Sequence, residues 1–259
     1  MANTQGVTVQ SVIKAFNVLE CFENKKELGI SDISKQMGIS KSTIYGIVNT
    51  LVETGLLEQD GESKKYRLGL KLFEFGRIVE KRMDLRDEAK PFCIELSEKY
   101  VQTVHLATHS EGEVVYIDKF DVPDFLIVYS QVGRRAPMTC TGVGKAMLAY
   151  LGKDYIEKYI IPKGFPKKTE KSIDTAEKLY ADLEDVRKRG YAIDNEEIEQ
   201  GLKCIAVPIF NKNGKPVAAV SLSGMAAKME KISTSAIAGD VIKCADEISA
   251  RLGYKRGNS

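Results

Sequence analysis

The sequence is poor in the residues on which most catalytic and metal sites depend. Only two histidines are present, and the five cysteines are widely spaced with no C-x-x-C pair. We therefore expect no histidine-based catalysis, no structural zinc site and no disulfide framework, and the thiols should be reduced. No apolar run approaches the roughly 18 residues of a membrane span. Residues 1–6 also lack the basic start and apolar stretch of a secretory signal, so a cytoplasmic location is expected.

Glycine and proline together account for only 28 of the 259 residues. A collagen-like, mucin-like or wholly disordered chain is therefore excluded. The 43% of apolar residues can form a sizeable core. At about 150 residues per domain, the length predicts one or two domains. The formal net charge of +2 does not by itself point to a nucleic-acid partner.

The first part of the chain, residues 1–68, has the pattern of short helices followed by a hairpin. Apolar residues recur there at helical spacing, and the polar stretch 60–63 separates two short strand-like runs. Residues 30–45 have the order of a helix-turn-helix, whose second helix fits the major groove of DNA. The hairpin would then form a wing against the phosphates. The expected helix caps are Ser11, Ser31 and Ser40.

The predicted DNA contacts lie mainly on the exposed side of that second helix and on the basic hairpin. Polar side chains suit base edges, and lysine or arginine suits phosphates. A simpler alternative is a small helical domain that binds protein or nothing, because residues 1–68 carry as many acidic as basic residues. The predicted DNA-binding residues are Ser11, Lys41, Ser42, Thr43, Tyr45, Asn49, Lys64, Lys65 and Arg67.

Residues 70–82 form a further helical pattern whose apolar positions cover more than one narrow stripe. Such a helix between two domains is expected to pack on something outside its own domain. The later pattern of clustered strands and helices favours an α+β sheet domain. Helices are expected at 86–100, 142–151, 154–160, 174–189 and 232–252, and strands at 103–109, 113–120, 125–131, 202–210 and 215–223.

The stretch 141–145 invites comparison with a phosphate-binding loop. Thr139 and Ala146, however, stand where that motif requires a glycine and a serine or threonine, so a nucleotide is not expected. A glycine-rich turn that opens a helix still leaves backbone N–H groups pointing outward, with the positive end of the helix dipole behind them. A small carboxylate could bind there. Glycines that only allow close helix packing are an equal alternative.

Several motifs resemble the IclR family of bacterial transcription regulators, in the same order through nearly the whole chain. They are Val9-Gln10-Ser11, Lys41-Ser42-Thr43, Asn49-Thr50-Leu51, Gly55-Leu56-Leu57 and the segments 133–138, 141–149, 189–197, 201–209 and 221–224. The resemblance implies a winged helix-turn-helix over 1–68, a linker and dimerisation helix over 69–84, and a GAF-like antiparallel-sheet effector domain with flanking helices over 85–259. It also implies homodimers, often paired into tetramers.

The resemblance further implies an effector site between a helix start and the sheet. Hydroxyl, thiol and carboxyl groups there suit the oxygens of a small oxo- or hydroxy-acid, and Ser221 and Ser223 alternate on a strand and so face one side. The implied effector-binding residues are Phe125, Val128, Gly142, Val143, Asp194, Leu202, Cys204, Ser221 and Ser223. For each residue alone, packing or a local hydrogen bond is an equal alternative.

Two other kinds of site remain open in the sequence. His105 and His109 could bind a metal from one strand face, although ordinary sheet packing is the simpler interpretation. Cys204 as a nucleophile would need a base, and the sequence places neither histidine beside it. We therefore expect a ligand-responsive regulator of double-stranded operator DNA, more often a repressor than an activator, with no catalysis, cofactor or metal. The competing hypothesis is a metabolite-binding module or enzyme without DNA function.

Overall fold

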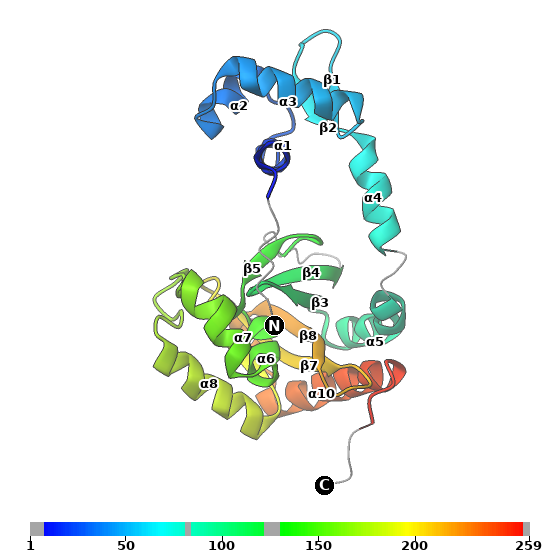
Figure 1. The fold of residues 1–259 in the computed structure, drawn as a ribbon. Helices are drawn as coiled ribbons and strands as arrows, with labels where there is room; N and C mark the ends of the chain where they lie inside the picture. Colours follow the sequence, from blue (N-terminus) through cyan, green and yellow to red (C-terminus); the bar gives the residue numbers. More distant parts are fainter. Residues whose placement is uncertain (1–7, 81–83, 122–129, 256–259) are drawn as a thin grey trace. The chain divides into compact units, whose positions relative to one another are not determined.

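A computed structural model describes residues 8–80, 84–121 and 130–255 of the chain (Figure 1). The chain divides into two compact units, Met1–Met83 and Asp84–Ser259, each with its own buried apolar cluster. Within the described ranges, none of the helices combines the length and the hydropathy that a membrane span requires.

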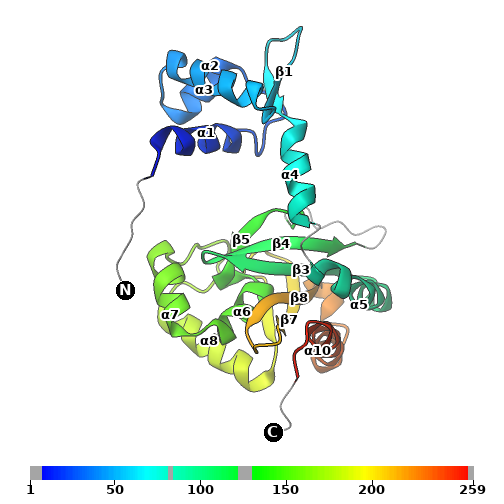
Figure 2. The ribbon, with the colours of Figure 1, turned by 45° about the vertical axis from the view of Figure 1, so that its right-hand side comes forward.

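The first unit packs short helices and a two-stranded hairpin around one small core (Figure 2). Its elements are α1 (Gln10–Glu20), α2 (Ile30–Met37), α3 (Lys41–Glu53), β1 (Leu57–Gln59), β2 (Tyr66–Leu68) and α4 (Leu70–Glu80). Ile33, Ile44 and Val48 are fully buried where α2 meets α3. The turn between these helices requires Gly38, whose φ of 67° lies in the left-handed region. The predicted helix-turn-helix is therefore present.

Only one of the three predicted serine caps is confirmed. Ser40 precedes α3, and its Oγ accepts a hydrogen bond from the backbone N–H of Thr43. Helices α1 and α2 begin one residue before the predicted serine, so Ser11 and Ser31 lie inside the first turn. In α2 the carboxylate of Asp32 instead accepts from the backbone N–H of the residue that precedes the helix, at 3.0 Å. A carboxylate inside the first turn has taken over the capping role.

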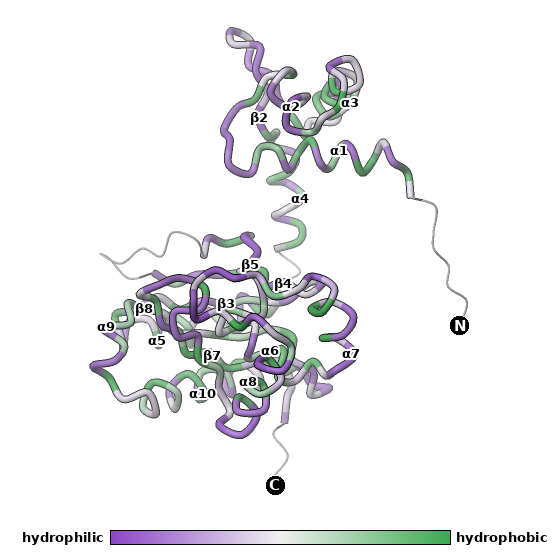
Figure 3. The backbone as a smooth tube through the Cα atoms, turned by 90° about the vertical axis from the view of Figure 1, so that its left-hand side faces the viewer, coloured by the Kyte–Doolittle hydropathy of each residue, from purple (hydrophilic) through white to green (hydrophobic). Residues whose placement is uncertain are grey.

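Helix α4 exposes most of its large apolar side chains. Figure 3 marks hydrophobic segments along it. The exposed apolar residues of α4 are Leu70, Phe73, Phe75, Ile78 and Val79, which are between 49% and 72% exposed. Val12 and Phe16 on α1 are 53% and 63% exposed. The first unit alone therefore leaves two helices with unburied apolar surface.

The second unit is a six-stranded antiparallel sheet with helices on both faces (Figure 1). The strand order β5-β4-β3-β8-β7-β6 joins β5 (Arg135–Pro137), β4 (Glu113–Phe120), β3 (Thr103–Ser110), β8 (Pro216–Met225), β7 (Leu202–Phe210) and β6 (Ala192–Asn195). Helices α5 (Asp84–Tyr100) and α10 (Thr234–Arg251) pack on one face. Helix α6 (Gly142–Leu151) covers the other face and packs against α8 (Ala176–Arg189). The shorter elements are η1 (Met138–Cys140), α7 (Lys153–Tyr155), η2 (Ile156–Ile160), η3 (Ile161–Lys163) and α9 (Ala226–Met229).

The expected α+β class is confirmed, but two short strands were not predicted. β5 has three residues and β6 has four, too few for an alternating pattern to stand out in the sequence. The predicted strand 125–131 lies outside the described residues, except for 130 and 131, which are not in a strand.

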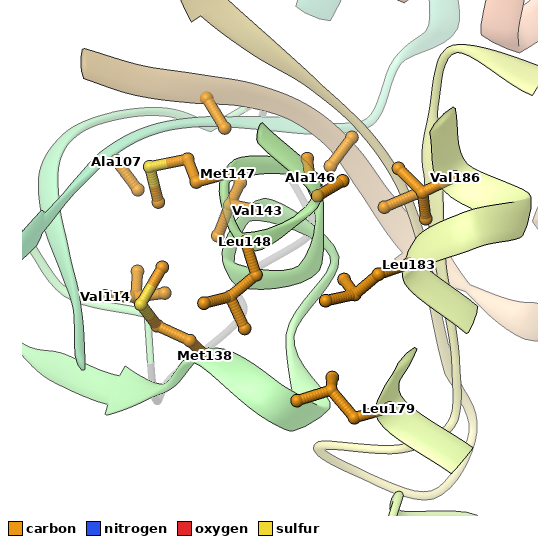
Figure 4. Packing of buried hydrophobic residues seen from close by; sticks show 14 of the residues in the cluster. Ala107, Val114, Met138, Val143, Ala146, Met147, Leu148, Leu179, Leu183 and Val186 are labelled. Atoms are coloured by element: carbon orange, nitrogen blue, oxygen red, sulfur yellow. The ribbon is translucent and has the colours of Figure 1, made fainter. Parts of the chain in front are cut away.

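Helix α6 is buried on nearly every side, which explains its apolar composition. Every residue from Gly142 to Ala149 is buried. Figure 4 shows its side chains between the sheet side and α8. The labelled members of this core are Ala107, Val114, Met138, Val143, Ala146, Met147, Leu148, Leu179, Leu183 and Val186. The start of α6 is therefore held rigidly against the sheet.

Candidate functional site

The first candidate site is the solvent side of α3. Ile44, Val48 and Leu51 are buried and hold the helix on its core. The opposite side is exposed, and Lys41 carries the single charge between residues 40 and 52. The predicted contacts that the structure leaves exposed on α3 are Lys41, Ser42, Thr43, Tyr45 and Asn49.

Some of the predicted DNA contacts also take part in the cap of α3 or line a nearby apolar groove. The hydroxyl oxygens of Thr43 and Ser42 lie 2.9 and 3.2 Å from that of the capping residue Ser40. Ser11, Ser42 and Thr43 also line an apolar groove of about 850 Å³ formed by residues of α1, α3 and α4. The predicted DNA contacts on α3 that do not line this groove are Lys41, Tyr45 and Asn49.

The hairpin between β1 and β2 is closed by its own hydrogen bonds. The carboxylate of Asp60 accepts from the backbone N–H of Ser63 at 2.7 Å and from its hydroxyl at 2.8 Å. These bonds, the backbone one first, hold the pKa of Asp60 below its usual value. Lys64 follows with a φ of 57°, and Lys64 and Lys65 are both exposed. A fixed hairpin tip therefore presents two ammonium groups to solvent.

Arg67 on the same hairpin is exposed but already paired. Its Nε and Nη2 donate to Oε2 of Glu58 at 3.1 and 3.0 Å. The other oxygen of Glu58 accepts from the backbone N–H of Leu70, the first residue of α4, at 3.2 Å. This backbone bond, followed by the Arg67 bond, lowers the pKa of Glu58. Arginine has further N–H donors, so the pairing leaves some of them for a phosphate.

The second candidate site lies where the start of α6 meets the sheet. A Cβ atom on Gly142 would come within 2.7 Å of Sγ of Cys204 and 3.7 Å of Cβ of Asp194, so this approach requires glycine. Strand register places Asp194 opposite Cys204, and Cys204 opposite Ser223. Ser221 lies two residues before Ser223 and faces the same side. The structure therefore brings five of the predicted residues together.

The start of α6 also offers backbone donors. The first N–H groups of a helix have no partner within its own ladder. Thr141 caps α6, and its Oγ1 accepts from the N–H of Gly144 at 3.3 Å. The amides of Gly142 and Val143 stay outside the helical ladder, at the positive end of the helix dipole. Of the predicted apolar wall, Leu202 is partly buried at the start of β7, whereas Phe125 and Val128 lie outside the described residues.

His105 also belongs to this site, although the sequence analysis did not predict this role for it. Its Nδ1 lies 3.2 Å from Oγ of Ser223, and its Nε2 lies 2.6 Å from Oγ of Ser130. Burial, followed by the charge of Lys119, lowers the pKa of His105 to about 3, so the ring is neutral. The available signal was the alternation of polar Thr103 and His105 with apolar neighbours on one strand.

The site holds a neutral imidazole and a protonated thiol rather than a reactive pair. Burial raises the pKa of Cys204 to about 12, so its thiol stays protonated. Burial raises the pKa of Asp194 to about 7, the nearby carboxylate of Glu197 adds to the effect, and a hydrogen bond from the Glu197 N–H opposes it. With a neutral His105 and a protonated thiol, the site suits binding and not nucleophilic chemistry.

Lys145 stabilises the site through Glu197, a role that the sequence analysis did not predict. The side chain is 1% exposed, and its Nζ lies 2.6 Å from Oε1 of Glu197 and 3.3 Å from Oδ2 of Asp182. The backbone N–H of Glu197 in turn donates to Oδ1 of Asp194 at 2.8 Å. Lys145 therefore fixes the turn that positions Asp194. A lysine inside an otherwise apolar helix was the available signal, because a buried ammonium needs a partner.

No metal site is formed by the described residues. They contain no group of three or more His, Cys, Asp or Glu side chains that could hold a metal ion. His105 bonds to Ser223 and Ser130, whereas the Nδ1 of His109 lies 3.0 Å from the hydroxyl of Tyr155.

Each of the two units matches a known protein family. The family described as "Bacterial transcriptional regulator IclR C-terminal" matches residues 78–250, and the "IclR helix-turn-helix domain" matches residues 11–61. The HTH-type transcriptional regulator KdgR of Escherichia coli is 37% identical over 247 residues, which cover 95% of this chain and 94% of that protein.

A second relative and a solved structure are also similar to this chain over nearly its whole length. The transcriptional repressor IclR of Escherichia coli is 29% identical over 251 residues, which cover 96% of this chain and 92% of that protein. The crystal structure of the Thermotoga maritima IclR has a TM-score of 0.76 at 34% identity, covering 95% of this chain and 99% of that one. The chain therefore belongs to the IclR family of DNA-binding bacterial transcription regulators, a family of non-enzymes.

Proposed function

We propose that this protein is a cytoplasmic, homodimeric repressor that binds double-stranded operator DNA and responds to a small organic acid. The observation that carries the proposal is the convergence of Gly142, Asp194, Cys204, Ser221 and Ser223 in the unit that follows the helix-turn-helix. These groups form a compact set of hydrogen-bonding partners in a buried, water-poor place.

The chemistry of these groups favours an oxo- or hydroxy-acid. The effector carboxylate would accept from the amides of Gly142 and Val143 at the positive end of α6. Its remaining oxygens would accept from the hydroxyls of Ser221 and Ser223 and from the thiol of Cys204. Leu202, with Phe125 and Val128, would complete the site as its apolar wall.

On the DNA side, α3 would enter the major groove while the hairpin contacts the phosphates. Residues 1–68 would form the DNA-binding domain, 69–84 the linker and dimerisation helix, and 85–259 the effector domain. The exposed apolar surface of α1 and α4 supports a dimer, which can pair further into a tetramer. An effector that binds one arrangement of the dimer better shifts the population toward it and so changes the spacing of the two recognition helices.

The hairpin gives a prediction about salt. The double change Lys64→Ala and Arg67→Ala should weaken binding to operator and random DNA alike, because phosphate contacts carry no sequence information. The slope of log K against log salt should become shallower by about 2, since each lost phosphate contact releases fewer counterions. Fluorescence anisotropy at several salt concentrations measures the slope.

Glu58→Gln, which releases Arg67 from its partner, is the control and should not flatten the slope. An unchanged slope in the double variant would show that the hairpin does not touch the DNA backbone.

The effector site is tested by Ser221→Ala with Ser223→Ala. The double variant loses about two hydrogen bonds to the ligand, so affinity for the acid should fall at least about tenfold. The acid is first found by thermal shift with pyruvate, lactate and related oxo- and hydroxy-acids, and its affinity is then measured by calorimetry. Operator binding without acid should survive, because the substituted residues lie in the other unit.

A matched control for this pair is Ser233→Ala with Ser235→Ala. These serines are also two residues apart in the second unit, but both are exposed. They should leave the affinity unchanged. Intact acid affinity in the Ser221 and Ser223 double variant would refute the site, and loss of both acid and operator binding would make these serines structural.

The raised pKa of Asp194 predicts a pH dependence. Below a pH of about 7 its carboxyl group is neutral. Above that pH, its negative charge stands beside the effector carboxylate, so affinity should fall as the pH rises. Asp194→Asn keeps the shape without the charge and should remove most of this dependence. Calorimetry on either side of pH 7 measures the change, and equal pH dependence of the wild type and the variant would exclude Asp194 as its source.

A further inference from the structure

A concave site lies in the second unit, apart from the residues around Gly142. This α8 cleft holds about 310 Å³ and is lined by the ends of α6, α8 and β7 together with part of α10 and Tyr254. Its volume falls at the lower end of the range of about 300–1,000 Å³ that is typical of ligand pockets. None of the described residues proposed to bind the effector lines it. A ligand in this cleft would therefore be additional to the effector.

Part of the cleft is an aromatic wall. The rings of Tyr150 and Phe210 meet edge to face with their centroids 5.2 Å apart. The ring of Tyr254 lies 5.1 Å from that of Phe210, at an angle of 31°. All three side chains keep some exposure, and Pro208 and Ile242 add aliphatic surface beside them. A planar ring of a ligand can stack on this wall.

The last turn of α8 lines the cleft with Arg187, Lys188 and Arg189. The two arginines are fixed by backbone carbonyls: Arg187 donates from Nη1 to Ala149 at 2.9 Å, and Arg189 donates from Nε to Tyr191 at 2.6 Å. Each also has a carboxylate nearby: Nε and Nη2 of Arg187 donate to Oε2 of Glu184 at 3.2 and 2.9 Å, and Nη2 of Arg189 lies 3.9 Å from Oδ1 of Asp182. Basic residues commonly complement the negative end of a helix dipole, so their charge alone does not indicate a ligand. Their position beside a concave aromatic wall does.

Lys188 is the cation best placed to take a new partner. Its ion pair with Asp185 spans 3.8 Å, and the two side chains are 68% and 65% exposed, so the pair contributes little stability. Asp246 is the carboxylate among the lining residues, and the three basic side chains leave the lining net positive. The charge therefore favours an anion.

We propose that the α8 cleft binds a small planar aromatic carboxylate. The ring would stack on Phe210 and Tyr254, and the carboxylate would accept charge-assisted hydrogen bonds from Lys188, with Arg187, which is paired with Glu184, as a fixed additional donor. This combination recognises both the ring and the charge, so a neutral aromatic analogue binds less tightly.

The test uses benzoate as the probe and benzamide as its neutral analogue, titrated into the full-length chain and followed by ligand-observed NMR. Benzoate should bind at least about fivefold more tightly than benzamide, since a charge-assisted bond is roughly twice as strong as a neutral one. Lys188→Gln and Tyr254→Leu should each weaken benzoate by at least about fivefold. Lys178→Gln is the matched control, because Lys178 is exposed on the same helix and does not line the cleft.

The variant with Ser221→Ala and Ser223→Ala separates this cleft from the effector site. Benzoate affinity should be unchanged in it if the α8 cleft is the binding place. Loss of benzoate binding in that serine variant, with intact binding in Lys188→Gln, would assign the probe to the effector site and overturn the proposal. No benzoate binding to the wild type at about ten millimolar would also overturn it, because a usable site should exceed that affinity.

Discussion

Lys145→Met should lower the free energy of unfolding of the second unit by about 3–5 kcal/mol at neutral pH, the usual cost of breaking a buried ion pair by removing one partner. The ammonium of Lys145 lies within 3.3 Å of carboxylate oxygens of both Glu197 and Asp182. Removing it leaves the carboxylate of Glu197, whose side chain is 10% exposed, without that cation, whereas Asp182 is 27% exposed and keeps Arg189 at 3.9 Å. Oε2 of Glu197 already has no hydrogen-bond partner among the described residues.

Chemical denaturation of the full chain, with hydrogen exchange to assign the loss to the second unit, measures the effect. Lys178→Met is the matched control: Lys178 pairs with Asp174 on the surface and should cost less than about 1 kcal/mol. Lys145→Met with Glu197→Gln should recover part of the loss, because one unpaired charge is removed. The loss should also shrink as the pH falls, since protonation neutralises the acids. If Lys145→Met behaves like Lys178→Met, the cluster does not stabilise the unit.

Phe73→Asp should convert the proposed dimer to a monomer and lower operator affinity by about 100-fold or more, the scale of the advantage that joining two binding modules gives. Phe73 is 66% exposed on α4, so the change should not disturb the fold of the first unit. In a dimer contact, however, it would bury a carboxylate against apolar side chains, which is costly without a partner. A monomer can hold only one half-site.

Sedimentation and operator anisotropy on the same samples test this prediction. Lys71→Asp places the same carboxylate at a polar, exposed position of the same helix and should leave the proposed dimer intact. A Phe73→Asp protein that remains dimeric and binds the operator normally would remove α4 from the dimer contact.

The sequence predicted best where the signals are local. The helix-turn-helix follows from the helical spacing of apolar residues on either side of Gly38. Glycine adopts the left-handed φ of this turn without help from distant residues. The helix caps were less predictable because Asp32 and Ser31 compete within one turn, and only the final geometry shows which group accepts the hydrogen bond. A helix cap contributes about 1 kcal/mol to stability, and the choice between two neighbouring capping groups does not show in the hydrophobic pattern of the sequence.

The site residues that sequence reasoning missed depend on partners far along the chain. Lys145 is paired with Glu197, 52 residues away, and His105 with Ser223, 118 residues away. Nothing at either position shows from the sequence which strand or turn will supply the partner. The residues implied by family resemblance came together because the register of β6, β7 and β8 aligns Asp194, Cys204 and Ser223.

The most direct test of the account is the affinity of the full-length chain for DNA upstream of its own gene, measured against random DNA with and without an acid that stabilises the second unit. We expect tighter binding to the upstream DNA, a steep dependence on salt, and a clear change in operator affinity when the acid is added. Equal binding to both DNAs, or an operator affinity that does not change when the acid is bound, would contradict a ligand-responsive DNA-binding regulator.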